Sequence, residues 1–174
     1  QYQANKVYCI VMDPKTGDIL AMANRPDFDP NNPPREMGYE EMQAYVKNIA
    51  AKDNMDPGST FKIITTAAAL EAGVISVNSA FNDPGYRMVD GQRIKCWKAG
   101  GHGHQTLFEA MQNSCNPAFM DMALSLGVDR FYDYLEDFGF GSPTGVDLHG
   151  EEKGVIMKRD SVRNVDLARM GFGQ

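Results

Sequence analysis

Two short apolar runs near the beginning of the chain predict a β-hairpin. The first, Val7–Asp13, is rich in β-branched and aromatic residues, and the second, Asp18–Asn24, follows residues 14–17, which favour a turn. We expect both strands to be well buried. The Pro-, Asn- and Asp-rich segment Arg25–Pro34 then predicts an irregular loop, and the polar segment Glu36–Ala51 predicts a helix.

A nearly continuous apolar run predicts a buried helix from Phe61 to Ala72. Four polar residues interrupt it, namely Lys62, Thr65, Thr66 and Glu71. A helix with so little polar surface belongs in the core, and Gly73 supplies the usual C-terminal stop. Residues 55–58 (Met-Asp-Pro-Gly) break the preceding element, so Ser59 is predicted to cap this helix at its N-terminus.

The second half of the chain predicts brief strands followed by several helices. Residues 78–103 are rich in Gly, Asp and Lys, with short apolar islands between them. Thr106 begins a capping-box pattern, and the Asn-Pro pair at 116–117 predicts the cap and first turn of a helix that ends at Gly127. A further helix is expected at 129–138. Together with the hairpin, these elements predict an α+β fold in which an antiparallel sheet is flanked by helices.

The composition fits one globular domain and disfavours nucleic-acid binding. A chain of 174 residues with 43% hydrophobic content can form a sizeable core, while a net charge of -6 and a pI near 5.0 leave no basic stripe for a phosphate backbone. No apolar run approaches the roughly 18 residues of a membrane span. Cysteines at 9, 96 and 115 are odd in number, which argues against a disulfide framework.

Ser59 and Lys62 have the spacing of an activated nucleophile. A three-residue step on a helix puts the hydroxyl and the amine on one face. A lysine on an apolar helix surface loses hydration of its charged form, which lowers its pKa and leaves a neutral amine as base. The alternative is that Ser59 only caps the helix and that Lys62 reaches solvent. Ser114 and Asn116, a Ser-x-Asn triplet, favour catalysis, because they can supply a second hydroxyl and an amide if their helix junction folds against Ser59.

The order and context of these motifs resemble those of class B penicillin-binding proteins. The resemblance rests on residues 57–62 (Pro-Gly-Ser-Thr-Phe-Lys), 113–117 (Asn-Ser-Cys-Asn-Pro), 138–141 (Phe-Gly-Phe-Gly) and 145–148 (Gly-Val-Asp-Leu), and it runs over nearly the whole chain. Within the family, residues 83–97 and the following Gly-His-Gly resemble the sporulation-specific, stage V protein D type.

This resemblance implies a peptidoglycan D,D-transpeptidase whose sheet is joined by an all-helical lobe. Ser59 would attack the penultimate D-alanine carbonyl of a stem peptide, D-alanine would leave, and an amine of another stem would take the acyl group. Lys62, Ser114 and Asn116 complete the implied catalytic set. The implied partners are stem peptides, β-lactam antibiotics that acylate Ser59, and a glycosyltransferase of the wall-synthesis machinery. The implied location is extracytoplasmic, on a membrane anchor upstream of Gln1.

One motif of the family departs from its expected place. A Lys-Thr/Ser-Gly strand should follow Asn116, and none does; Lys15-Thr16-Gly17 precedes the nucleophile and fits a hairpin turn instead. We therefore expect residues 1–174 to form the N-terminal part of a single transpeptidase domain, incomplete at the C-terminus and with little independent activity.

Four further residues have the chemistry of a structural zinc site. Cys96, His102, His104 and Cys115 offer thiolate and imidazole ligands, and Cys115 lies between two predicted catalytic residues. Zinc would brace the Ser114 loop from behind. Their spacing matches no standard zinc finger, and buried cysteines with exposed histidines are the competing interpretation.

Two other functions stay open at this point. A serine β-lactamase or β-lactam sensor would use the same Ser59 and Lys62, but the Glu-x-x-x-Asn arrangement of class A β-lactamases is not found after Asn116. A noncatalytic, metal-stabilised interaction module would carry the serine and lysine as relics. Replacing Lys62 separates the enzyme from the module, because only the enzyme would lose acylation.

Overall fold

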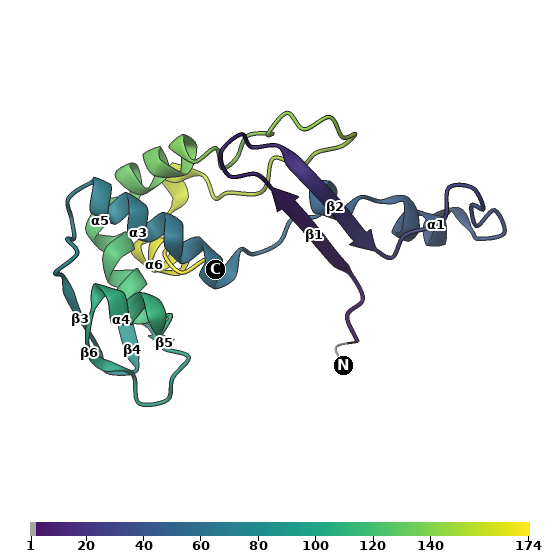
Figure 1. Cartoon of the computed structure of the whole chain (residues 1–174). Coiled ribbons are helices and arrows are strands. Elements are labelled where there is room, and N and C mark those ends of the chain that lie inside the picture. Colours follow the sequence, from purple (N-terminus) through teal and green to yellow (C-terminus); the bar gives the residue numbers. More distant parts are fainter. Residues whose placement is uncertain (1–2) are drawn as a thin grey trace. The chain divides into compact units, whose positions relative to one another are not determined.

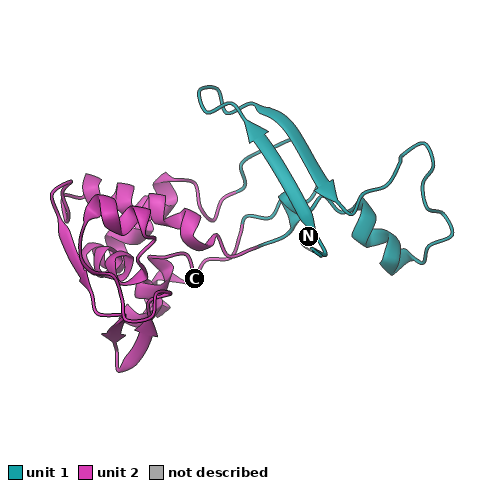
Figure 2. Cartoon of the chain, turned by 60° about the horizontal axis from the view of Figure 1, so that its bottom comes forward, with its two compact units in different colours: residues 1–54, 143–153 teal, residues 55–142, 154–174 magenta. Residues whose placement is uncertain are grey.

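The computed structural model describes residues 3–174, which form two compact units (Figure 2). One unit contains the chain up to Asn54 together with Pro143–Lys153, and the other contains Met55–Ser142 together with Gly154–Gln174. Strands and helices follow one another in groups along the chain, and the strands pair into small two-stranded antiparallel sheets. The predicted α+β class is confirmed.

The first unit is built on the predicted hairpin (Figure 1). Strand β1 (Val7–Met12) pairs antiparallel with β2 (Ile19–Arg25). In the turn between them the Gly17 amide donates to the Asp13 carbonyl at 2.8 Å, and Gly17 has a φ of +80°, which glycine adopts without strain. The expected burial of the strands is wrong: every residue of β1 is exposed. The main neighbours of each strand are its partner strand and one short helix, which cover little of the hairpin surface.

The polar segment after the loop forms two short helices instead of one. Helix α1 spans Tyr39–Val46 and α2 spans Ile49–Lys52. Between them Asn48 has an extended backbone, and its side-chain oxygen accepts a hydrogen bond from the Ala50 amide at 3.1 Å. An asparagine that caps a new helix competes with continuation of the old one, which explains the break.

The second unit has its core around one long helix. The 3₁₀ turn η1 (Gly58–Phe61) leads into α3 (Lys62–Glu71), and both α3 and α6 (Asn164–Met170) pack against α5 (Asn116–Asp137) (Figure 1). The largest fully buried side chains of this core include Phe119, Met120, Met122, Val165 and Leu167. The prediction of a buried helix after Ser59 is confirmed.

The helix ends follow the sequence signals closely. Helix α4 (Leu107–Gln112) begins with the predicted capping box, in which Thr106 Oγ1 accepts from the Glu109 amide and Glu109 accepts from the Thr106 amide. The cap of α5 is Cys115, one residue earlier than expected. Gly127 has a φ of +76° and kinks α5, so the two predicted helices are joined across a break at that glycine.

Four short strands precede α4 and α5 in the chain. Strand β3 (Ala80–Asp83) pairs with β6 (Gly103–Thr106), and β4 (Tyr86–Val89) pairs with β5 (Gln92–Lys95). The chain before α6 contains a second 3₁₀ turn, η2 (Arg159–Ser161). Among residues 3–174, no helix combines the length and the apolar character that crossing a bilayer requires.

Candidate functional site

The start of α3 brings Ser59 and Lys62 together. Ser59 lies inside η1 and Lys62 is the first residue of α3; the Lys62 Nζ donates to Ser59 Oγ at 3.2 Å. The three-residue spacing therefore brings the hydroxyl and the amine together, as predicted. Lys62 is only 3% exposed, so the alternative in which its side chain reaches solvent is wrong. The predicted capping role of Ser59 is also wrong, because Pro57 and Phe61 occupy the cap positions of η1 and α3.

The junction between α4 and α5 folds against these two residues. Lys62 Nζ donates to Ser114 Oγ and to the Ser114 carbonyl, each at 2.8 Å, and to Asn116 Oδ1 at 2.7 Å. Ser114 Oγ in turn donates to Ser59 Oγ at 3.1 Å. An ammonium has three N–H groups, so these oxygens share them. The structure thus places all four predicted catalytic residues in one hydrogen-bonded group.

Burial changes the acid–base behaviour of Lys62. Loss of hydration on burial lowers the pKa of its amine from 10.5 to about 8. The Phe119 ring, whose centroid lies 5.1 Å from Lys62 Nζ, forms an apolar wall on one side of the amine. At pH 7 about a tenth of an amine with this pKa is neutral and able to accept a proton. A base of usable strength therefore lies beside the Ser59 hydroxyl.

The group offers two routes for the Ser59 proton. Lys62 can take it directly across 3.2 Å, or through the Ser114 hydroxyl, whose Oγ lies 2.8 Å from Lys62 Nζ and 3.1 Å from Ser59 Oγ. Both distances are within or close to hydrogen-bond reach, which proton transfer to a positioned base requires. The arrangement is that of a serine nucleophile with its activating base.

A backbone contact from far along the chain supports the nucleophile turn, and the sequence analysis missed it. The Gly58 amide, one residue before Ser59, donates to the Gly173 carbonyl at 3.1 Å. A Cβ at Gly173 would lie 2.0 Å from the Gly58 carbonyl oxygen, so the two backbone segments are in contact and leave no room for a side chain at position 173. The Gly-Phe-Gly pattern at 171–173 was the available signal.

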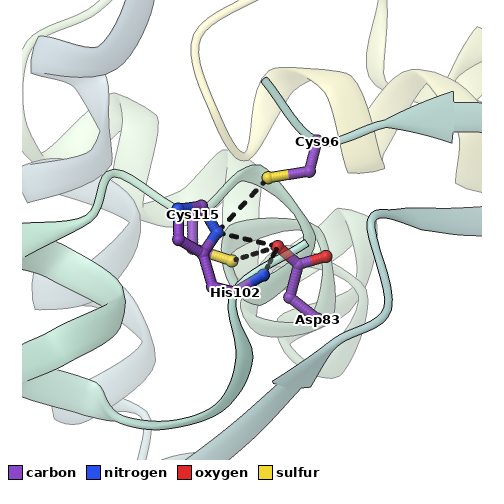
Figure 3. A group of neighbouring side chains, drawn as sticks. All are labelled: Asp83, Cys96, His102 and Cys115. Atoms are coloured by element: carbon purple, nitrogen blue, oxygen red, sulfur yellow. Dashed lines mark hydrogen bonds and ion pairs between the residues drawn. The ribbon is translucent and has the colours of Figure 1, made fainter. Parts of the chain in front are cut away.

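A second group of polar side chains lies just behind Ser114. Asp83, Cys96, His102 and Cys115 point toward one another, and one ligand atom from each lies within 4.8 Å of the others (Figure 3). His102 Nδ1 is 2.8 Å from Asp83 Oδ2, and Cys115 Sγ donates to the same oxygen at 3.3 Å. Burial raises the pKa of the Cys115 thiol to about 11. Two sulfurs, an imidazole nitrogen and a carboxylate oxygen form a donor set that suits zinc.

The sequence-based ligand set differs from this group at one position. His104 lies on β6, where it pairs with Asn82 in the sheet register, and it is exposed. His104 is therefore not one of the four converging side chains, and Asp83, the last residue of β3, is. In the sequence, Asp83 belongs only to the family resemblance of residues 83–97. A buried aspartate beside two cysteines in space has no signature in local sequence.

Known proteins match the chain over most of its length. Residues 7–174 match the family model described as penicillin binding protein transpeptidase domain. The chain is 43% identical over 177 residues to Stage V sporulation protein D of Bacillus subtilis, covering 100% of this chain and 26% of that protein. It is 32% identical over 160 residues to peptidoglycan D,D-transpeptidase MrdA of Escherichia coli K12, covering 87% and 25%. The chain thus spans about a quarter of the length of these relatives.

Solved structures share the same fold. Penicillin binding protein 3 from Mycobacterium tuberculosis, complexed with aztreonam, matches with a TM-score of 0.87 at 31% identity, over 98% of this chain and 37% of that one. PBP2 of Pseudomonas aeruginosa, in complex with WCK 5153, matches with a TM-score of 0.84 at 29% identity, over 95% and 41%. The fold of both units is therefore found in penicillin-binding proteins.

Proposed function

Because the chain belongs to the penicillin-binding protein transpeptidase domain family, we propose that it forms part of a peptidoglycan D,D-transpeptidase with Ser59 as nucleophile. The observation that carries the proposal is the buried Lys62 amine, which contacts Ser59 Oγ at 3.2 Å and Ser114 Oγ at 2.8 Å. A hydroxyl becomes a competent nucleophile when such a base accepts its proton.

The first half of the proposed reaction forms an acyl-enzyme. Ser59 Oγ attacks the carbonyl of the penultimate D-alanine of a stem peptide, while its proton moves to neutral Lys62, directly or through Ser114. The bond between the Ser59 oxygen and the acyl carbon forms, and the amide C–N bond to the terminal D-alanine breaks. The departing amine takes the proton that Lys62 received. Asn116 accepts from Lys62 and so holds the amine in place.

The second half transfers the acyl group. An amine of a neighbouring stem peptide attacks the ester carbonyl, a new amide bond forms, and the ester bond to Ser59 breaks. Lys62 accepts the proton that the attacking amine loses and returns it to the leaving Ser59 oxygen. A β-lactam would enter at the first step, and its opened ring would stay on Ser59.

Intact-mass measurement tests this proposal on a protein that contains the complete transpeptidase domain. Incubation with benzylpenicillin should add the mass of one opened β-lactam to the wild-type protein, and Ser59→Ala should abolish the adduct. Ser142→Ala, at an exposed serine, serves as the matched control and should keep it. An adduct that survives in the Ser59 variant contradicts the proposal. An adduct lost within minutes by hydrolysis would indicate a β-lactamase instead.

The proposal extends to location and partners. Peptidoglycan lies outside the cytoplasm, so we place the domain there, on a membrane anchor outside residues 1–174, beside a glycosyltransferase that supplies glycan strands. The similarity to a stage V sporulation protein supports a role in sporulation. Membrane fractionation and affinity purification of the full-length protein test the anchor and the partner, and recovery in the cytosolic fraction would contradict both.

We also propose that Asp83, Cys96, His102 and Cys115 hold a structural zinc ion. Support comes from the convergence of four suitable donor atoms and from their burial, because a closed site of four protein ligands is typical of structural zinc. Such an ion holds its ligands in fixed positions. Cys115 separates Ser114 from Asn116 in the chain, so a bound ion would stabilise the loop that contacts Lys62.

Metal analysis of the purified protein tests the zinc proposal. We expect one zinc per chain, lost in Cys96→Ser and retained in Cys9→Ser, since Cys9 is an exposed residue of β1. A strong chelator should lower the midpoint of thermal unfolding of the wild-type protein and leave that of Cys96→Ser unchanged. Substoichiometric metal in a folded wild-type protein would refute the site.

A further inference from the structure

Gln105 is a buried polar residue that the proposed mechanism does not use. It lies on β6 and is 5% exposed, so its side chain points to the opposite face of the strand from the exposed His104. Its Oε1 accepts a hydrogen bond from Asn113 Nδ2 at 2.8 Å. Its Nε2 is buried and has no hydrogen-bond acceptor among residues 3–174. A buried N–H group without an acceptor costs about 1–3 kcal/mol, so a native structure normally supplies one.

The Gln105 amide lies near the sulfur of Cys115. Burial raises the pKa of the Cys115 thiol, and the Gln105 side chain acts against that rise. A side-chain amide has this effect when its N–H end faces the sulfur, because a donor stabilises a thiolate and a carbonyl oxygen does not. As a thiol, Cys115 donates to Asp83 Oδ2 at 3.3 Å, and its sulfur is only a weak acceptor. The N–H group of Gln105 therefore suits a thiolate better than a thiol.

Gln105 also connects the two residues that flank Ser114. Asn113 donates to its side-chain oxygen, and Cys115 lies near its side-chain nitrogen. Ser114 itself has a φ of +50°, in the left-handed region that costs a residue with a side chain about 1–2 kcal/mol. Its hydroxyl contacts Lys62 Nζ at 2.8 Å, so the position of this residue matters for the proposed reaction. One buried amide therefore supports the chain on both sides of a strained residue of the active site.

We propose that Gln105 is a positioning residue of the metal site, whose Nε2–H group donates to the Cys115 thiolate when zinc is bound. The inference rests on the zinc site proposed above and adds a residue outside its four ligands. Hydrogen bonds to metal ligands fix the orientation of those ligands, and their loss typically lowers metal affinity about 10- to 100-fold. Because the same amide holds Asn113, binding of the ion also orders residues 113–115.

Competition for zinc with a chelator of known affinity tests the inference on a protein that contains the complete transpeptidase domain. Gln105→Met keeps the length of the side chain but lacks the N–H group, so it should bind zinc about 10- to 100-fold more weakly than the wild-type protein. Gln112→Met, at an exposed residue of α4, is the matched control and should leave the zinc affinity unchanged. Equal zinc affinities of folded Gln105→Met and the wild-type protein would overturn the inference.

A magnetic resonance measurement on the wild-type protein needs no substitution and separates this role from a merely structural one. Addition of zinc to the metal-free protein should move the side-chain amide proton resonance of Gln105 downfield, because the group then donates to a charged sulfur. The corresponding resonance of Gln112 should stay in place. A Gln105 resonance that does not move when zinc binds would overturn the inference. A wild-type protein that binds no zinc would instead overturn the zinc proposal itself.

Discussion

Replacing Asn116 by aspartate tests whether Lys62 acts as a neutral base. Asn116 Oδ1 lies 2.7 Å from Lys62 Nζ, and aspartate has nearly the shape of asparagine, so the change adds a negative charge without altering the packing. A neighbouring carboxylate stabilises the ammonium form. Opposite charges at this range shift a pKa by about 1–3 units, so the pKa of Lys62 should rise from about 8 to roughly 9–11.

The size of the kinetic effect follows from the fraction of neutral amine. With a pKa of about 8, roughly a tenth of Lys62 is neutral at pH 7. After a rise of 1–3 units, about one part in a hundred to one in ten thousand is neutral. Acylation of Ser59 at pH 7 should therefore fall about 10- to 1,000-fold, and alkaline pH should restore it.

The rate of acylation by benzylpenicillin, measured from pH 6 to pH 10, reports this shift. We expect the rising limb of the profile to move to higher pH in Asn116→Asp. Asn113→Asp places the same charge in the same loop, but the Asn113 amide points to Gln105, so its profile should move less. A rate that drops equally at every pH would refute the reasoning, because Asn116 would then act through the substrate and not through Lys62.

Three further changes test other features of the chain. Gly173→Ala should lower the free energy of unfolding, measured by urea denaturation, by about 2 kcal/mol or more, because the added methyl group would collide with the Gly58 carbonyl. The control Gly91→Ala, at a similar φ but in open space, should lower it by about 1 kcal/mol. Equal losses in the two variants would contradict the contact. Thr106→Ala should cost about 1 kcal/mol through loss of the capping box, and an unchanged urea midpoint would show that the cap is dispensable. Lys62 keeps its proton up to about pH 10.5 in the unfolded chain but releases it near pH 8 in the folded protein. As pH rises from 8 to 10.5, the free energy of unfolding of the wild-type protein should therefore increase by up to about 3 kcal/mol relative to that of Lys62→Met. A difference that stays constant with pH would contradict the lowered pKa.

Local patterns in the sequence predicted local features of the fold. The capping box at Thr106, the break at Gly127 and the hairpin turn at Gly17 each depend on residues within a few positions of one another, and the structure contains all three. The pairing of Ser59 with Lys62 belongs to the same class, because one helical step sets it.

Contacts between distant segments could not be read in the same way. The apolar run of β1 indicates which residues suit burial, but not what covers them, and these residues are exposed. Asp83 and Cys115 lie 32 positions apart, and no local spacing links them. The contact of Ser114 with Lys62 depends on how the α4–α5 junction folds, and the structure contains it.

Thr65 lies on α3, shortly after Ser59 in the chain. Its hydroxyl donates to the carbonyl of Gly171, which lies 106 residues further along the sequence. A ribosome that adds about 5–20 residues per second would finish the supporting segment several seconds after Thr65 leaves the peptidyl transfer centre. Until then the nascent chain contains Ser59 and Lys62 but not the C-terminal backbone that packs against the start of α3. The backbone that supports the start of α3 is therefore complete only once residues 171–173, which follow α6, have been made.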